Sequence, residues 1–381
     1  MKIIRCICLF LTFILLLATP IDVLSVSDDE ITAPSAVLME PKTGKILYEK
    51  NPHEIRACAS ITKVMTLVLV MEAIDSGEIS LTDNVTASAH AASMGGSDIW
   101  LEDGEVMSVD DLIKATVVAS ANDAAVALAE RIAGSEDTFV DKMNEKAKML
   151  NMNDTVFKNC NGLDEEGHLT SAYDVALMSR ELIKHKLIYN YTSIWMDNLR
   201  DGKTQIVNTN KLLKSYKGIT GLKTGTTNEA GSCISATAKR DDLELISVVL
   251  GSKTGKERFS DAAALLDYGF GNFTMISPVV PENFYDSVVK VKNGMESTAN
   301  TQIRLNGNFL IPKGRENDIK SDLQLEEEVE APVYKDQKLG SISFSLDDDV
   351  LAQYSITSLT EVQKMNFKSV FYVLSRQLLK L

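Results

Sequence analysis

The sequence predicts an α+β protein, in which a larger domain with an antiparallel sheet and a helical cluster precedes a small all-β domain. Helical apolar periodicity fills the middle of the first 273 residues, whereas strand-like runs lie at both ends of that region. After Phe273 the apolar positions alternate in short runs between acidic stretches, which is typical of several short strands. A chain of 381 residues is long enough for two such domains.

The first residues are typical of an export signal. Lys2 and Arg5 precede an apolar run from Ile7 to Ala18, and small residues follow at Ser25 and Ser27. The run is shorter than the roughly 20 residues that span a bilayer, so a transmembrane anchor is the weaker alternative. We expect residues 1–27 to be a signal peptide that is cleaved after either serine, and the mature protein to be exported.

The composition excludes several classes of function. A formal net charge of −14 argues against nucleic-acid binding, which requires a basic surface. Beyond the leader the cysteines are Cys58, Cys160 and Cys233, an odd number that predicts no disulfide framework and leaves a free thiol or an intermolecular bridge. The histidines are scattered, without HExxH or CxxC spacing, so no metal or other cofactor is expected.

The elements of the larger domain, expected over residues 28–273, follow from local patterns. Two β-rich runs joined by a Pro-led turn predict a hairpin at Ser35–Glu40 and Lys45–Lys50. Helical spacing predicts a helix from Ser60 to Gly77, two buried helical pieces around Ser120 within Val109–Ala133, and helices at Thr138–Leu150, Ala172–Lys184 and Asp261–Tyr268. Strands are expected at Ser232–Ala238 and Leu243–Leu250, so that both ends of the domain contribute to one sheet.

The second domain is expected over residues 274–356, with strands that include Val288–Val291 and Ser341–Leu346. Residues 357–381 are predicted to form an amphipathic helix. Its apolar residues follow i, i+3, i+4, i+7 spacing from Phe367 to Leu381, and its charged residues from Lys364 onward are all basic. Such a helix can lie in an anionic membrane surface; the alternative is a helix that packs on its own domain or on a partner.

Ser60 and Lys63 are the first candidates for chemistry. On a helix, residues three apart share a face, so the lysine amine can reach the serine hydroxyl and act as its base if burial or a second cation lowers the lysine pKa. The motif by itself is weak, since Ser60 can equally be a helix N-cap with a solvated Lys63. A second copy, Ser287–Lys290, lies in an alternating strand pattern, where positions three apart point to opposite faces.

Ser120 and Asn122 interrupt an apolar stretch rich in alanine and valine. Buried polar side chains need hydrogen-bond partners. A helix cap or an internal hydrogen-bond network would explain them structurally. The functional interpretation is that Ser120 relays a proton toward a leaving group and that Asn122 binds a substrate amide.

Lys-Thr-Gly occurs three times, so its position must decide which copy is functional. Lys42–Gly44 is the hairpin turn, and Lys253–Gly255 follows a strand in a polar turn. Lys223, Thr224 and Gly225 precede the Cys233–Ala238 run and are expected on an edge strand beside a cleft. There the glycine would let substrate approach, while Lys223 and the threonine hydroxyls would hold a carboxylate. Lys223 is also a candidate for the second cation that keeps Lys63 neutral.

With these three motifs in this order, the chain resembles the serine D-alanyl-D-alanine carboxypeptidases, a family of low-molecular-mass penicillin-binding proteins. The resemblance covers residues 30–273 closely and the remainder loosely. It extends to Asn208–Leu213 and His168–Asp174, which we interpret as scaffold. It implies a penicillin-recognising, transpeptidase/β-lactamase-like domain, a β-rich second domain and a C-terminal amphipathic anchor. The implied activity is removal of the terminal D-alanine from peptidoglycan stem peptides at the cell wall, by an enzyme that β-lactam antibiotics acylate.

The resemblance also implies roles for individual residues. Ser60 is the acylated nucleophile, Lys63 its base and Ser120 the proton relay. The residues expected to bind substrate are Asn122, Lys223, Thr224, Gly225, Thr226 and Arg258, and the backbone N–H groups of Ser60 and Thr226 are expected to form the oxyanion hole. For Arg258, exposure on the surface is the alternative. Cys58 replaces the family's usual proline, which leaves a thiol near the site and raises the question of redox sensitivity.

The residues can be compared with three alternative functions: a β-lactamase, a transpeptidase and a non-catalytic sensor. A class A β-lactamase would need a Glu-x-x-Leu-Asn string, which this sequence lacks. A transpeptidase shares the acylation step, and the sequence does not say whether water or an amine takes the acyl group. A non-catalytic sensor of peptidoglycan or β-lactams would not need Lys63 and Ser120. We therefore expect a carboxypeptidase.

Overall fold

The computed structural model describes residues 27, 30–285 and 287–378. The predicted leader, apart from Ser27, and the last three residues lie outside the described residues. The described chain divides into two compact units between Asn272 and Phe273. We call residues 30–272 the first unit and residues 273–378 the second unit.

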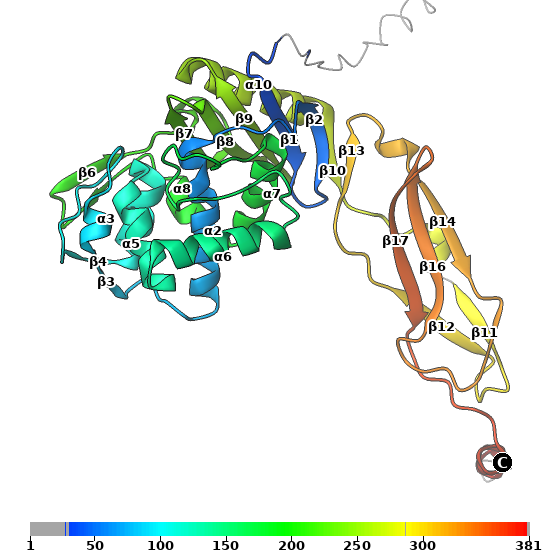
Figure 1. The fold of residues 1–381 in the computed structure, drawn as a ribbon. Coiled ribbons are helices and arrows are strands. Elements are labelled where there is room, and N and C mark those ends of the chain that lie inside the picture. Colours follow the sequence, from blue (N-terminus) through cyan, green and yellow to red (C-terminus); the bar gives the residue numbers. More distant parts are fainter. Residues whose placement is uncertain (1–26, 28–29, 286, 379–381) are drawn as a thin grey trace, which may run out of the picture. The chain divides into compact units, whose positions relative to one another are not determined.

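A five-stranded antiparallel sheet organises the first unit (Figure 1). The strand order is β2-β1-β9-β8-β7, so the N-terminal hairpin pairs with strands that follow it by some 200 residues in sequence. The bounds are β1 Ser35–Glu40, β2 Lys45–Lys50, β7 Ile219–Thr227, β8 Gly231–Arg240 and β9 Leu243–Ser252. The α+β prediction is confirmed, and β7 is an edge strand as expected.

Helices cover both faces of this sheet (Figure 1). Helix α10 packs on β8 and β9, and a cluster around α2 and α7 packs on the other face. The helices are α2 Lys63–Asp75, α3 Ala89–Ala92, α4 Val109–Lys114, α5 Asn122–Ala133, α6 Glu136–Met149, α7 Ala172–Leu182, α8 Tyr189–Thr192, α9 Leu212–Ser215 and α10 Gly255–Asn272. Helix α2 is apolar all round and lies at the centre of the core, which is why its sequence shows so little amphipathic contrast.

Two short two-stranded sheets are absent from the sequence prediction. They are β3 Asn84–Thr86 with β4 Val106–Ser108, and β5 Met196–Leu199 with β6 Thr204–Val207. Strands of three or four residues carry too few alternating positions to be recognised in a sequence. Helix α10 is also longer than the predicted Asp261–Tyr268, because it begins directly at Gly255 of the third Lys-Thr-Gly copy.

The second unit is an all-β domain followed by a helix. A six-stranded sheet has the order β14-β16-β17-β12-β11-β15, and β10 pairs with β13 separately. The bounds are β10 Phe273–Ile276, β11 Val288–Lys292, β12 Thr298–Ile303, β13 Phe309–Pro312, β14 Lys320–Leu325, β15 Glu328–Glu330, β16 Lys338–Leu346, β17 Asp349–Ser358 and α11 Phe367–Leu378. The terminal helix begins ten residues after the expected start at residue 357, because β17 and bridges at Val362 and Lys364 hold the chain extended until then.

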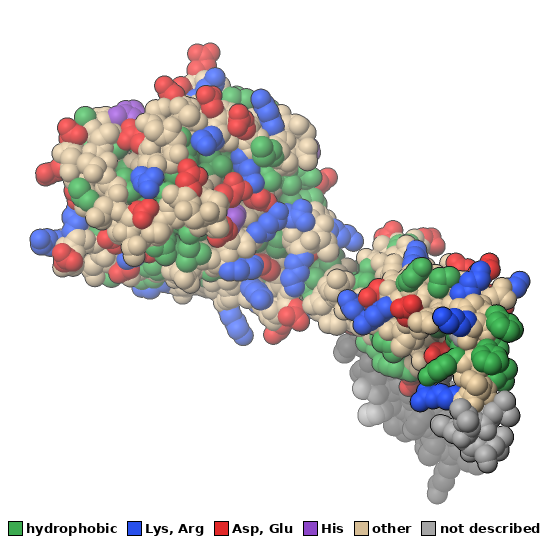
Figure 2. All heavy atoms as spheres, turned by 90° about the horizontal axis from the view of Figure 1, so that it is seen from below, with side chains coloured by type: hydrophobic (Ala, Val, Ile, Leu, Met, Phe, Trp, Pro, Cys, Tyr) green, Lys and Arg blue, Asp and Glu red, His purple; other side chains and the backbone are tan. Residues whose placement is uncertain are grey.

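None of the helices in the described part of the chain has the length and hydropathy that a membrane span requires. Acidic and basic side chains are interspersed on the face of the protein that Figure 2 shows. Helix α11 is amphipathic and keeps large apolar side chains exposed, among them Phe367, Phe371 and Leu374.

Candidate active site

Ser60 lies in a 3₁₀ turn, Ala59–Thr62, that leads directly into α2. The preceding Ala59 has a left-handed φ of 51°, an uncommon conformation for a residue with a Cβ. The backbone of another segment presses on this turn, since a Cβ added at Gly162 would lie 2.0 Å from Ala59 O. The serine is therefore presented on a turn whose strained conformation the surrounding chain maintains.

Lys63 is fully buried one helical turn after Ser60. Its Nζ lies 3.0 Å from Ser60 Oγ, 2.5 Å from Asn122 Oδ1 and 2.6 Å from the carbonyl oxygen of Asn161. Burial lowers the pKa of the Lys63 amine from 10.5 to about 7, although the negative charges of Asp98 and Asp123 oppose that decrease. Burial thus makes the unprotonated amine far more accessible at neutral pH than it is for an exposed lysine.

The three contacts of Lys63 suit both protonation states of the amine, because the ammonium donates one N–H bond to each of the three oxygens, Ser60 Oγ included. A neutral amine has two N–H bonds and one lone pair, and Asn122 Oδ1 and Asn161 O are both acceptors. The two N–H bonds therefore go to these oxygens, and the lone pair is left to accept the hydroxyl proton of Ser60. This is the arrangement that a general base needs before it takes a proton.

Ser120 and Asn122 lie on opposite sides of a break between two helical segments. A wide helical turn, Ala115–Ala119, ends at Ser120, whose φ of 62° is left-handed, and α5 begins at Asn122. Asn122 donates to Gly95 O at 2.6 Å while it accepts from Lys63. An amide has two donors and two acceptor sites, so one of each remains for a substrate amide.

Strand β7 brings Lys223 to Ser120. Lys223 is buried, and its Nζ donates to Ser120 Oγ at 2.8 Å and to Thr224 O at 2.9 Å. Burial, followed by repulsion from Lys63 and Arg258, holds the pKa of the Lys223 amine well below its ordinary value. Burial is also the first cause for Lys63, and the repulsion between the two amines is mutual, so it disfavours the state in which both are protonated.

Gly225 has a close backbone contact that the sequence did not predict. A Cβ at this position would lie 2.6 Å from Cys58 O and 3.0 Å from Ser60 N. The glycine thus lets the turn that carries Ser60 approach β7, rather than only making room for substrate. It also brings the N–H of Ser60 close to the strand that holds Thr226, as the predicted oxyanion hole requires.

The remaining predicted residues surround this part of β7. Thr224 Oγ1 is 2.6 Å from Thr209 Oγ1, and Thr226 is exposed. Arg258, on α10, is buried rather than exposed on the surface, and its Nη1 donates to Gly225 O and to Thr226 Oγ1, both at 2.8 Å. All nine predicted site residues are connected through β7 and the Ser60 turn.

Two residues that support the site were predicted only as scaffold or not at all. The carbonyl of Asn161 could not be recognised from sequence, because any residue type supplies that group. His168 contacts the turn that carries Ser60. Its Nδ1 accepts the Lys158 N–H at 3.0 Å, so the ring proton is on Nε2. Nε2 donates to Thr62 Oγ1 at 2.7 Å. Burial lowers the pKa of His168 to about 4, so the ring is neutral at physiological pH.

Cys58 does not behave as a reactive thiol. Its side chain is buried, its Sγ lies 3.4 Å from Thr62 Oγ1, and burial raises its pKa to about 12. Thiolate, not thiol, is the reactive species. The suggested redox sensitivity of the site is therefore not supported by the environment of Cys58.

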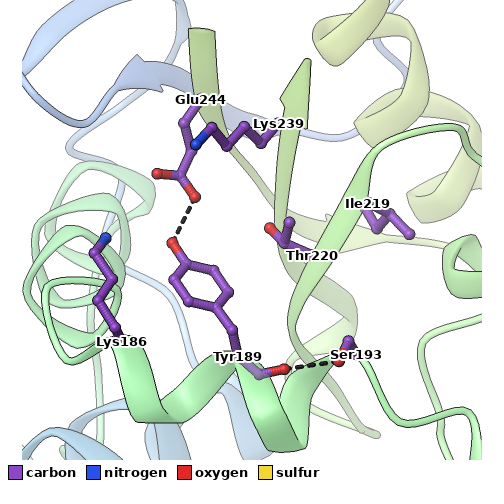
Figure 3. Close-up of a pocket in the computed structure, with 7 residues that line it drawn as sticks. All are labelled: Lys186, Tyr189, Ser193, Ile219, Thr220, Lys239 and Glu244. Carbon is purple, nitrogen blue, oxygen red and sulfur yellow. Dashed lines mark hydrogen bonds between the residues drawn. The ribbon is translucent and has the colours of Figure 1, made fainter. Parts of the chain in front are cut away.

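A separate cavity of about 350 Å³ lies beside the beginning of β7 (Figure 3). Its lining includes Ile219, Thr220 and the pair Tyr189–Glu244, in which the tyrosine hydroxyl donates to the carboxylate at 2.5 Å. None of the predicted site residues lines this cavity.

Comparison with known families gives two matches. The profile of the D-alanyl-D-alanine carboxypeptidase family matches residues 22–254. The profile of the penicillin-binding protein 5 C-terminal domain matches residues 277–364. The two matches follow one another along the chain, as the two units of the structure do.

Individual relatives agree with these families. D-alanyl-D-alanine carboxypeptidase DacF of Bacillus subtilis (strain 168) is 44% identical over 339 residues, which cover 88% of this chain and 87% of DacF. The solved structure of penicillin-binding protein 5 from Haemophilus influenzae matches with a TM-score of 0.75 at 31% identity, over 89% of this chain and all of the other. Penicillin-binding protein D2 from Listeria monocytogenes, in its ampicillin-bound form, matches with a TM-score of 0.59 at 34% identity, over 64% of this chain and 100% of the other.

Proposed function

Because the chain belongs to the D-alanyl-D-alanine carboxypeptidase family, we propose that it removes the terminal D-alanine from peptidoglycan stem peptides through an ester on Ser60, with Lys63 as the general base. It is a serine-type D-alanyl-D-alanine carboxypeptidase that acts on the cell wall, and β-lactams acylate it. The assignment of roles to single residues is our proposal from the geometry.

In the first step, Ser60 Oγ attacks the carbonyl carbon of the penultimate D-alanine, while the hydroxyl proton passes to Lys63 Nζ. The backbone N–H groups of Ser60 and Thr226 stabilise the oxyanion. The C–N bond to the terminal D-alanine then breaks, and its nitrogen receives a proton from Lys63 through Ser120. Water then attacks the ester carbonyl carbon while its proton passes to Lys63 Nζ. The C–O bond to Ser60 breaks as Ser60 Oγ takes that proton, which releases the shortened peptide and frees the enzyme.

The substrate carboxylate is held at the Lys223 side of the site. Lys223 and the hydroxyls of Thr224 and Thr226 form the proposed anchor, and Arg258 holds Thr226 from behind. An arriving carboxylate favours the protonated form of Lys223, which burial otherwise disfavours. Substrate thus strengthens its own anchor, while Asn122 binds the peptide amide.

The observation that carries this proposal is the hydrogen-bond arrangement of Lys63. When the buried Lys63 amine is unprotonated, its two N–H bonds go to Asn122 Oδ1 and Asn161 O, which can only accept, and its lone pair faces Ser60 Oγ, 3.0 Å away. Lys223 Nζ also donates to Ser120 Oγ, the hydroxyl that is proposed to relay the proton.

We expect a labelled penicillin to modify Ser60. Peptide mapping should locate the label on Ser60, and Ser60→Ala should abolish labelling. Ser287→Ala, in the other Ser-x-x-Lys string, is the matched control and should label like the wild type, because that serine lies directly before strand β11 and not at the start of a helix. Label on any other residue would overturn the assignment of the nucleophile. Release of D-alanine from a peptide that ends in D-Ala-D-Ala then separates an enzyme from a sensor, which would be acylated without turnover.

We further propose that the chain is exported and that α11 binds the outer face of the cytoplasmic membrane. The helix exposes Phe367, Phe371 and Leu374, and its charged residues are Lys368 and Arg376. Apolar side chains can enter the acyl boundary while lysine and arginine contact anionic headgroups.

Fractionation of cells that express the full chain tests this proposal. We expect the protein in the membrane fraction, with its N-terminus at Val26 or Asp28, depending on the serine after which the leader is cleaved. A chain that ends before Phe367 should be exported but no longer sediment with membranes. If the truncated chain still sediments, or if it unfolds because the helix packs on its own domain, membrane binding by α11 is excluded.

A further inference from the structure

The acceptor that orients Lys63 is a backbone carbonyl in an irregular segment. Asn161 O lies in residues 158–163, which form neither helix nor strand. The carbonyl is held through its own peptide unit, in which Gly162 N donates to Asn159 Oδ1 at 2.7 Å, and through the residue before it. Cys160 O accepts from Thr66 Oγ1 at 2.5 Å, and Cys160 N donates to Glu136 Oε1 at 2.9 Å.

Glu136 is well placed to hold this segment. It begins α6, and its side chain is only 13% exposed. Its second oxygen, Oε2, pairs with His90 Nε2 at 2.8 Å, so both carboxylate oxygens have partners. A partly buried carboxylate that accepts a backbone N–H forms a strong, charge-assisted hydrogen bond. Helix α6 is itself packed on α2 and α5, so the carboxylate is attached to a rigid part of the core.

We propose that Glu136 is a positioning residue for the general base. It fixes the N–H of Cys160, and thereby helps to set the direction of the Asn161 carbonyl two peptide units further on. That carbonyl takes one of the two N–H bonds of the neutral Lys63 amine, which leaves the lone pair aimed at Ser60. Glu136 touches neither substrate nor the reacting atoms. The inference rests on the proposed role of Lys63 as the base.

A purely structural role is the alternative, and the chain offers a control for it. An acidic residue in the first turn of a helix interacts favourably with the helix dipole. Asp137 is also acidic, lies in the same turn and is exposed. Asp137→Ala removes the same charge from the same helix end but leaves the bond to Cys160 intact.

The test is the rate of Ser60 acylation by a labelled penicillin as a function of pH. We expect Glu136→Ala to lower the plateau rate about 10- to 100-fold, since a displacement of about 1 Å can cost that much. The midpoint of the acidic limb should move below the wild-type value, because an ammonium loses more than an amine when an acceptor is withdrawn. Glu136→Gln should keep most of the rate, since its amide oxygen can still accept the Cys160 N–H, and Asp137→Ala should match the wild type.

The inference would be overturned if Glu136→Ala kept the wild-type acylation rate and the wild-type midpoint of the acidic limb. It would also be overturned if Asp137→Ala lost as much of the acylation rate as Glu136→Ala does. If Glu136→Ala does not fold, Glu136→Asp takes its place, because it keeps the charge but withdraws the carboxylate by one methylene. A wild-type profile in Glu136→Asp then counts against the inference in the same way. Failure of the wild type to be labelled at Ser60 would instead refute the proposed function.

Discussion

Replacing Lys63 by methionine is expected to lower the rate of acylation by at least about 10³-fold, because the variant keeps the length of the side chain but has no group that accepts the Ser60 proton. Lys290→Met is the matched control. It removes the lysine of the second Ser-x-x-Lys string, on strand β11, and should leave the rate unchanged. The rate is measured as labelling of Ser60 by a penicillin in both variants.

The wild-type rate should depend on pH through the same amine. Since the Lys63 pKa is about 7, the rate of acylation should fall below pH 7 as the lone pair is protonated and should level off above pH 7.

The free energy of unfolding should depend on pH through the same buried amine, but over a higher pH range. The unfolded chain binds the lysine proton up to pH 10.5, so Lys63 destabilises the fold near pH 7, and this cost shrinks as pH rises toward 10.5. Lys63→Met should lack that rise in stability. If Lys63→Met is acylated at a rate within tenfold of the wild-type rate, Lys63 is excluded as the base.

Gly225→Ala is expected to reduce acylation by about 100-fold or more, because displacement of the nucleophile turn by an ångström is enough for such a loss. Its Cβ would meet two backbone atoms, Cys58 O and Ser60 N, and neither can rotate away as a side chain would. We also expect unfolding to become easier by about 1–3 kcal/mol, the usual cost of overpacking. Denaturant unfolding and penicillin labelling measure the two effects.

The third Lys-Thr-Gly copy supplies the control for this substitution. A Cβ at Gly255 would meet only the end of the Arg258 side chain, at 3.8 Å, which is an ordinary contact. Gly255→Ala should therefore retain activity close to that of the wild type. If Gly225→Ala were equally active, the close approach between β7 and the Ser60 turn would not be needed for catalysis.

Much of the first unit could be predicted from sequence because its signals are local. The hairpin at Ser35–Glu40 and Lys45–Lys50 was predicted with the bounds that the structure has, since a Pro-led turn separates two β-rich runs. The same local logic distinguished Ser60–Lys63 on a helix from Ser287–Lys290 on a strand. The order of the three motifs was sufficient to identify the family.

Three features of the site depended on long-range contacts and could not be predicted. Burial is the largest cause that lowers the pKa of Lys63, and burial is known only once the surrounding elements are in place. Gly225 faces the backbone of Cys58, from which it is separated by more than 160 residues, so no local pattern reveals the contact. The carbonyl of Asn161 carries no side-chain signal at all.

The sequence alone thus determined which side chains this protein uses and on which kinds of element they lie, because residue type and periodicity are properties of neighbouring positions. Only the tertiary structure decided how the amine of Lys63 is desolvated and where its lone pair points. Those properties arise from groups on α2, α5 and the segment around Asn161, which are distant in sequence and meet only when the chain has folded.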